Sequence, residues 1–306
     1  MESIANEELF TPVARESTNA QEIVRPSTTY WQDVWRRLKK NRMAMAGLCM
    51  IVLIIALAIF GPILSPYTYS DQDLNATNQP PSAAHWFGTD NLGRDLLTRV
   101  LFGARISLSV GFVASFIILT IGVIYGGISG FFGGWLDNLM MRIVDILWAV
   151  PLTLFVILLM VVMGPGLLTI FVALGSVYWV GMARIVRGQI ISLKNQEFVL
   201  AARTIGASPW RILLRHLIPN AMGPIIVTVT LNIPNAIFTE AFLSFIGLGV
   251  SAPMASWGVL ASEGAQSIRA YPWQIFFPAL AISLTMLAFN FLGDGLRDAL
   301  DPRMRR

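Results

Sequence analysis

The chain has 306 residues, of which 55% are hydrophobic and 13% are charged, with a formal net charge of +4. Soluble domains usually carry about 25% charged residues, so this composition predicts a protein embedded in the lipid bilayer, and we expect no nucleic-acid partner. One cysteine and two histidines exclude an intrachain disulfide and a metal site built from a cysteine–histidine cluster.

The first 42 residues are polar and end in a basic run. They lack the basic start and the apolar core of a cleaved signal peptide. We therefore expect residues 1–42 to form a cytoplasmic N-terminal tail, followed by a basic segment directly before the membrane.

Six apolar segments are long enough to cross a bilayer, which takes roughly 20 residues in a helix. They cover residues 43–64, 106–132, 143–163, 167–183, 224–247 and 273–292. The sequence Gly-Pro-Gly at residues 164–166 predicts a tight hairpin between the third and fourth segments. The predicted fold is an all-α polytopic membrane protein with six transmembrane helices.

The distribution of lysine and arginine predicts the orientation of these spans. With six spans, 18 of the basic residues fall on the side of the two termini and four on the other side. Basic residues accumulate in cytoplasmic segments, so we expect both termini, including the tail 294–306, to be cytoplasmic. Residues 65–105 and 248–272 are then extracytoplasmic loops.

Between the fourth and fifth spans, residues 196–220 form a short basic segment that we call the elbow. Gly206 is expected to end a first helix, because glycine accepts a positive φ without strain. Ser208 then fits an N-cap and Pro209 the first position of a second helix. Pro219 is expected to stop this second helix, since proline has no N–H to donate.

The second helix of the elbow is predicted to be amphipathic. Its apolar stripe consists of Trp210, Leu213 and Leu214, and its polar side carries Arg211 and Arg215. Such a segment can pack against its own spans and against a soluble partner. It can equally lie on anionic lipid headgroups as an interfacial helix, and the residue pattern leaves both alternatives open.

The elbow resembles the cytoplasmic signature loop of ABC-importer permeases, in which an alanine pair precedes a glycine by four residues and an Ile/Leu-Pro pair follows at a distance. The matching positions here are Ala201, Ala202, Gly206, Ile218 and Pro219. The usual glutamate of this loop is replaced by Leu200, and Glu197 lies one turn upstream. Four further stretches resemble the C-type membrane subunit of oligopeptide and dipeptide permeases: HWFGTDNLGRDLLTRVLFGARISL, GFFGGWLDNLMMRIVDILWAVP, TEAFLSFIGLG and FNFLGDGLRDALDPRMRR.

This resemblance implies a type I ABC-importer permease fold, with span 43–64 preceding a permease domain at residues 106–293. It implies a bacterial inner-membrane heterodimer with a B-type permease subunit, two cytoplasmic ATPases that bind ATP and Mg, an extracytoplasmic binding protein and a peptide substrate. It also implies that the elbow contacts the ATPases through Glu197, Ala201, Ala202, Gly206, Ala207, Ser208, Pro209, Trp210 and Arg211.

The lysines exclude a phosphate-binding P-loop, which needs a lysine directly after a glycine. None of the three lysines follows a glycine, so we expect this chain to bind no cofactor and to be no enzyme by itself. Two alternatives remain open: the same machinery importing nickel chelates or another small solute, and a transporter driven by an ion gradient.

The fifth predicted span contains the candidate pathway residues Asn232, Asn235 and Glu240. Pro234 can kink this span, and a charged group at bilayer depth is tolerated only where it faces protein or water. Glu240 therefore either lines the pathway or bonds to a neighbouring helix, and the asparagines either line water or satisfy packing.

Two further polar features carry local predictions. Arg142 and Asp145 are three residues apart and are expected to pair on one helix face. His85 and His216 have no partner spacing that suggests a metal.

Overall fold

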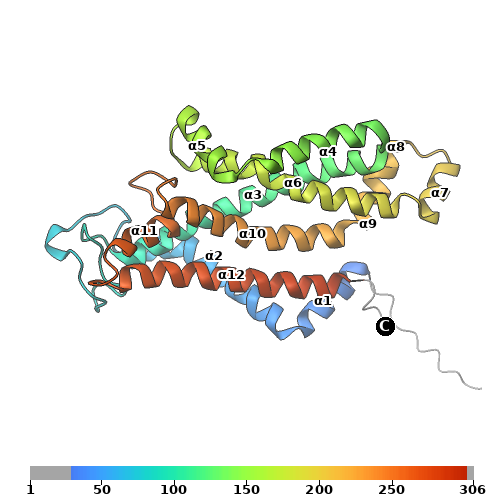
Figure 1. The fold of residues 1–306 in the computed structure, drawn as a ribbon. Helices are drawn as coiled ribbons and strands as arrows, with labels where there is room; N and C mark the ends of the chain where they lie inside the picture. The colour runs from blue at the N-terminus through green and yellow to red at the C-terminus, as the bar shows by residue number, and fades with distance from the viewer. Residues whose placement is uncertain (1–28, 302–306) are drawn as a thin grey trace, which may run out of the picture.

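The computed structural model describes residues 29–301, and the parts of the two predicted tails at residues 1–28 and 302–306 lie outside the described residues. Within residues 29–301 the chain is helical, with a single isolated bridge between Thr89 and Asp95 in place of any strand. The helices form an elongated bundle (Figure 1). The all-α fold predicted from the sequence is confirmed.

The helices follow one another in a simple order. They are α1 (Tyr30–Lys40), α2 (Arg42–Leu64), α3 (Leu96–Phe132), α4 (Gly134–Ala149), α5 (Leu152–Met163), α6 (Leu167–Leu193), α7 (Glu197–Thr204), α8 (Pro209–Ile212), α9 (Ile218–Asn220), α10 (Met222–Phe245), α11 (Trp257–Gln266) and α12 (Trp273–Leu300). A 3₁₀ turn covers Leu74–Ala76, and a π-helical turn, Leu213–Leu217, joins α8 to α9.

Within residues 29–301, five continuous helices are long and apolar enough to cross a membrane: α2, α3, α6, the helix from α8 to α10, and α12. The third predicted span, 143–163, is instead divided between α4 and α5, whose axes meet at 85°. The break lies at Pro151, because a proline disfavours the helical conformation of the residue before it, and Val150 is extended with φ −83° and ψ 122°.

Helix α3 packs closely against α6 through three glycines spaced four residues apart, Gly122, Gly126 and Gly130. A methyl group on Gly126 would lie 2.3 Å from the carbonyl oxygen of Ala183, and one on Gly130 would lie 2.8 Å from that of Arg187. Small residues at this spacing let two helix backbones approach, which is how membrane helices associate without a hydrophobic driving force.

The bundle has two distinct ends. We call one the loop end, where residues 65–95 and α11 lie, and the other the elbow end, where α7, α8, α1 and the last turn of α12 lie (Figure 1). At the loop end, α3 begins at Leu96 because the Asp95 carboxylate caps it by accepting a hydrogen bond from the N–H of Thr98 at 2.8 Å. The first ten residues of α3 therefore lie within the predicted extracytoplasmic segment 65–105.

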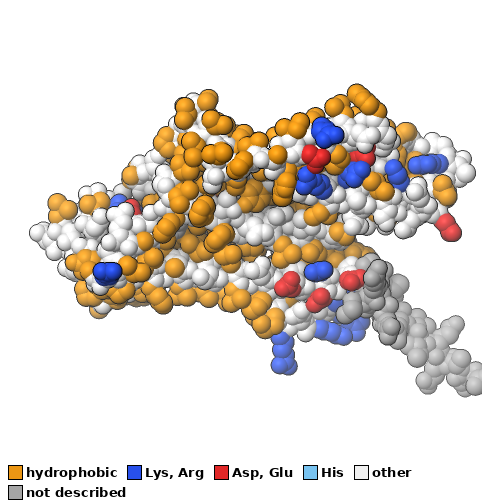
Figure 2. Space-filling view, in the orientation of Figure 1, with side chains coloured by type: hydrophobic (Ala, Val, Ile, Leu, Met, Phe, Trp, Pro, Cys, Tyr) orange, Lys and Arg blue, Asp and Glu red, His pale blue; other side chains and the backbone are white. Residues whose placement is uncertain are grey.

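Charged side chains gather at the elbow end on the face shown in Figure 2, whereas the middle of the bundle is covered largely by hydrophobic side chains. The middle includes large apolar side chains of α2 that are exposed, among them Val52, Leu53 and Phe60. Exposed apolar side chains between two polar ends fit a chain surrounded by lipid.

Candidate functional site

The elbow folds as two helices separated by a glycine turn. Gly206 has φ +78°, and its N–H donates to the carbonyl of Arg203 while the N–H of Ala207 donates to that of Ala202, each at 3.0 Å. This pair of bonds is the Schellman arrangement that closes a helix at a left-handed residue. The predicted helix end at Gly206 is confirmed.

The second helix of the elbow starts as predicted but does not stop where predicted. The Ser208 hydroxyl accepts a hydrogen bond from the N–H of Arg211 at 3.4 Å, and Pro209 is the first helical residue. The prediction that Pro219 ends this helix is wrong. The wide turn before it lets the N–H of Ile218 bond to the carbonyl of Leu213, so the chain stays helical past the proline into α10.

Of the three residues in the predicted apolar stripe of the elbow, Leu213 is the one buried against the bundle. Trp210 and Leu214 are exposed, and the buried contacts are made instead by Ile212, Leu213 and Leu217. We call the exposed apolar side chains of the elbow, Leu200, Ile205, Trp210 and Leu214, the elbow patch, and Ile205 among them is 85% exposed.

The other elbow residues singled out in the sequence surround this patch or support it. Glu197, Ala201, Ser208, Pro209 and Arg211 are exposed, Ala207 is half-buried, and Ala202 is buried. Ala202 packs in the same apolar cluster as Val199, Ile212 and Leu213, so it holds α7 against the bundle. The elbow therefore has one face fixed to its own chain and another that is uncovered.

A groove of about 450 Å³ runs beside α10, open on one side. Asn232 and Asn235 line it together with Thr228 and Thr239 of α10, Tyr178 of α6 and Trp148 of α4. The Tyr178 hydroxyl and the Thr239 hydroxyl share a hydrogen bond, which joins the two walls. Polar side chains thus interrupt an otherwise apolar surface in the middle part of the chain.

Glu240 lies on another side of α10, outside the lining of this groove, and is fully buried. Its carboxylate accepts hydrogen bonds from Ser107 of α3 at 3.0 Å and from Ser244 at 2.7 Å. Ser244 in turn accepts from Ser256, the N-cap of α11, at 3.2 Å, and the N–H of Trp257 donates to Ser107. This chain of hydrogen bonds fastens the start of α11 to α3 and α10.

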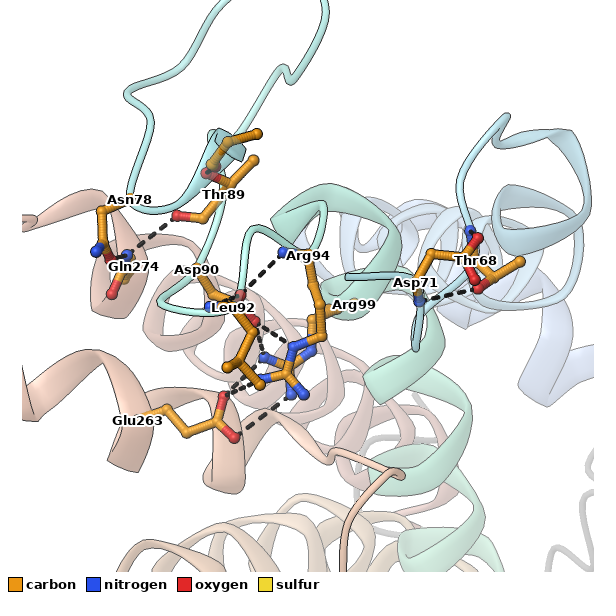
Figure 3. Close-up of polar contacts among 11 residues, drawn as sticks. Thr68, Asp71, Asn78, Thr89, Asp90, Leu92, Arg94, Arg99, Glu263 and Gln274 are labelled. Atoms are coloured by element: carbon orange, nitrogen blue, oxygen red, sulfur yellow. Dashed lines mark hydrogen bonds and ion pairs between the residues drawn. The ribbon is translucent and has the colours of Figure 1, made fainter. Parts of the chain in front are cut away.

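A buried ionic cluster at the loop end was not predicted from the sequence. Arg99, whose side chain is 2% exposed, forms salt bridges with Asp90 and, at 2.7 Å, with Glu263 of α11. Arg94 also pairs with Asp90, at 2.6 Å. Figure 3 shows these four side chains converging between the loop, α3 and α11. Glu263 is 164 residues from Arg99 in the chain, so no local pattern could have signalled this contact.

The pairing predicted between Arg142 and Asp145 is wrong. The Asp145 carboxylate binds Arg184 of α6 at 2.8 Å instead, because α4 lies along α6. A second salt bridge, from Arg187 to Asp137, is bidentate with both distances at 2.6 Å and also joins α6 to α4. Side chains from the neighbouring helix therefore replace the local pair.

The histidines take part in no metal site among the described residues, where no group of three or more metal-ligating side chains occurs. The His85 Nδ1 atom lies 2.9 Å from the Asp95 carboxylate, the same group that caps α3. His85 therefore belongs to the structure of the loop end.

Comparisons with known proteins agree with this architecture. Residues 118–306 match the family described as the binding-protein-dependent transport system inner membrane component, and residues 29–81 match the N-terminal transmembrane domain of oligopeptide transport permease C. The chain is 56% identical to the dipeptide transport system permease protein DppC of Bacillus subtilis (strain 168), over 98% of this chain and 94% of the relative. It is 55% identical to the oligopeptide transport system permease protein OppC of the same organism, over 97% of this chain and 98% of the relative.

Among solved structures, a chain of the MetNI methionine ABC transporter in its inward-facing conformations superposes with a TM-score of 0.55. It is 20% identical in sequence, and the match covers 66% of this chain and 96% of that chain. This likeness confirms the predicted type I ABC-importer permease fold. With a family match over more than half of its length and relatives of this identity, the chain belongs to the family of binding-protein-dependent transport system inner membrane components.

Proposed function

We propose that this chain is the transmembrane permease subunit of an ATP-driven importer of oligopeptides or dipeptides. The proposal is supported by relatives of 56% and 55% identity whose names state dipeptide and oligopeptide transport, matched over nearly the whole chain. As a permease, the chain is a transport component and not an enzyme. ATP and Mg are bound by separate ATPase subunits, because the sequence has no lysine directly after a glycine.

The observation that carries the proposed coupling to ATPases is the elbow patch. Ile205 is 85% exposed, and Trp210 and Leu214 are each more than half exposed, at the charged end of the molecule. Apolar patches rimmed by polar residues mark interaction sites on protein surfaces. In the proposed assembly, two cytoplasmic ATPases bind two permease subunits, and the elbow patch fills a groove on one of them.

The groove beside α10 is proposed as half of the translocation pathway. Asn232 and Asn235 offer amide groups, which suit the polar backbone of a peptide without selecting its side chains. A B-type permease subunit would close the open side of the groove. Glu240 is proposed as a packing acid that positions α11, since it is buried and its hydrogen bonds to Ser107 of α3 and Ser244 of α10 continue to Ser256 and Trp257 at the start of α11.

We also propose that the elbow end faces the cytoplasm and the loop end the exterior of a bacterial inner membrane, where a peptide-binding protein docks. The basic side chains of the elbow end support this orientation. Single cysteines at Ser82 and Ser208 can test it in a Cys49→Ala background. An impermeant thiol reagent applied to intact cells should label position 82 and spare position 208, and the reverse pattern would overturn the orientation.

The proposed function can be tested by reconstituting the chain with a B-type subunit, the ATPases and the binding protein in proteoliposomes. Uptake of a labelled dipeptide and a labelled pentapeptide should require internal ATP and should stop with vanadate. Uptake that follows an imposed ion gradient without ATP would instead support a secondary transporter. A matched complex with an ATPase that cannot hydrolyse ATP serves as the control.

The cargo can be tested in the same vesicles. A relative of 43% identity is named for glutathione transport, and small chelates are a second alternative. Unlabelled glutathione or a nickel chelate should compete poorly with the labelled peptides. Strong competition by either compound, with weak competition by peptides, would support the same ATP-driven importer with a different substrate.

A further inference from the structure

Helix α1 is short and strongly amphipathic. Val34 and Leu38, four residues apart, are buried against Ala44 of α2 and against Ala299 and Leu300 of α12. Trp31 and Trp35 occupy the adjacent strip of the helix and remain 54% and 46% exposed. The rest of the surface is polar. Docking of α1 on the bundle therefore uses only part of its apolar sector and leaves two indole rings uncovered.

The position of α1 is fixed by the helix that follows it. Asn41 ends α1 and at the same time caps α2, accepting a hydrogen bond from the N–H of Ala44 at 3.1 Å. Because α2 enters the membrane directly from Asn41, α1 lies at the level where the bilayer surface begins. Further along α2, large apolar side chains such as Val52 and Leu53 are exposed as well, as expected of a helix in contact with lipid.

The exposed charges of α1 are almost all positive. Its one acidic residue, Asp33, pairs with Arg37 at 3.0 Å. Arg36, Lys39 and Lys40 are exposed, and the Lys39 ammonium lies 5.2 Å from the centre of the Trp35 ring. One flank of the helix thus combines indole rings with ammonium groups, and the next flank carries further basic side chains.

We propose that α1 is an interfacial helix that binds anionic lipid headgroups. Indole rings favour the boundary between the acyl chains and the headgroups, and basic side chains beside them attract anionic lipids. The interfacial alternative considered for the elbow thus fits α1, where the charge, the tryptophans and the adjoining span coincide. A groove on another protein would need acidic side chains to match this flank, whereas the leaflet next to α2 offers anionic headgroups without any partner.

The test uses the purified full-length chain in bilayers of phosphatidylcholine. A fluorophore is attached at Met43→Cys in a Cys49→Ala background, because Met43 is exposed in the first turn of α2 and leaves α1 unchanged. Quenching is compared for nitroxide-labelled phosphatidylglycerol and nitroxide-labelled phosphatidylcholine at equal, low mole fraction. The quencher carries its nitroxide near the glycerol end of the acyl chain.

We expect phosphatidylglycerol to be preferred by about fivefold to 100-fold at low salt, since each basic residue near the surface contributes up to about a factor of five. The triple variant Arg36→Gln, Lys39→Gln, Lys40→Gln should lose most of this preference. The charge-retaining variant Arg36→Lys, Lys39→Arg, Lys40→Arg should keep it.

A second measurement avoids any dependence on how the triple variant folds. In the fluorophore-labelled chain with α1 intact, raising the salt to about 1 M should reduce the preference strongly, because the screening length falls to about 3 Å. Equal quenching by the two lipids at low salt would overturn the proposal. A preference that survives either the triple substitution in a folded chain or high salt would also overturn it.

Discussion

At the loop end three buried charged side chains and the partly exposed Glu263 are paired with one another, whereas at the elbow end the four apolar side chains of the elbow patch are exposed. Arg94 and Arg99 are matched by Asp90 and Glu263 within the chain itself. The elbow patch has no such cover. The loop end is therefore stabilised by contacts within the chain, whereas the elbow end presents the surface that we propose binds an ATPase. This difference indicates that the two ends tolerate substitution in opposite ways.

The largest effect is expected when one residue of the ionic cluster is removed. The Asp90 carboxylate is only 6% exposed, and replacing Arg99 with alanine removes one of its two arginine partners. Breaking a buried ion pair in this way costs about 3–5 kcal/mol. We expect a clear fall in the thermal unfolding midpoint of the purified chain and a lower yield. Arg269→Ala is the matched control, because Arg269 is exposed at the same end and should change stability by no more than about 0.5 kcal/mol. Equal midpoints for the two variants would contradict a structural role for the cluster.

At the elbow end the corresponding substitution is Gly206→Arg. A methyl group on Gly206 would meet no atom within 4 Å in this chain, so only the positive φ costs stability, by roughly 1 kcal/mol. An ATPase packed over the turn would add about 1–3 kcal/mol of overpacking. Association with the ATPases should then weaken about fivefold to 150-fold while the chain still inserts and pairs with its permease partner.

Co-purification of the ATPases and peptide uptake both measure this effect. Gly206→Asn provides the control, since asparagine tolerates the left-handed conformation and is smaller than arginine. Wild-type values for Gly206→Arg in both measurements would mean that the elbow is not the coupling element.

A smaller effect is expected from Glu240, which joins α10 to the start of α11 at the loop end. Glu240→Ala leaves the hydroxyls of Ser107 and Ser244 without their acceptor, a loss of about 1–3 kcal/mol. Glu240→Gln keeps one acceptor oxygen and should cost less. Both variants should reduce the unfolding midpoint in that order, while uptake per folded complex stays unchanged. Reduced uptake by Glu240→Gln at normal stability would place Glu240 in the pathway instead.

Much of the fold could be predicted because apolar length is a strong signal for spans, yet the prolines show its limits. Pro151 breaks the third span although it lies inside an apolar segment. Pro219 does not end its helix, although it follows a basic segment. The difference lies in the turn before each residue. Val150, directly before Pro151, is extended, whereas a wide helical turn precedes Pro219. The sequence shows where the prolines are but not the conformation of the residues before them.

Those parts of the candidate site whose conformation depends on neighbouring residues could be predicted from the sequence. Gly206, Ser208 and Pro209 could be assigned because caps and left-handed turns depend on neighbouring residues. The partners of Asp145 and Arg99 could not, since Arg184 and Glu263 approach them only after the helices pack. Exposure of Trp210 also depends on which face of α8 meets the bundle. In the turn after α8, the neighbouring Leu213 and Leu214 have opposite burial.

The three glycines between α3 and α6 restrict how this molecule can move. A methyl group added at Gly126 would lie only 2.3 Å from the carbonyl oxygen of Ala183, so the two backbones pack closely there, and this close packing resists sliding of one helix past the other. We therefore expect the two helices to move as one rigid body. In the assembly proposed above, opening and closing would then come from rotation of this body against the second permease subunit. Spin labels at the exposed Ile124 and Ile185 should keep one distance with and without nucleotide, while distances to the partner subunit change.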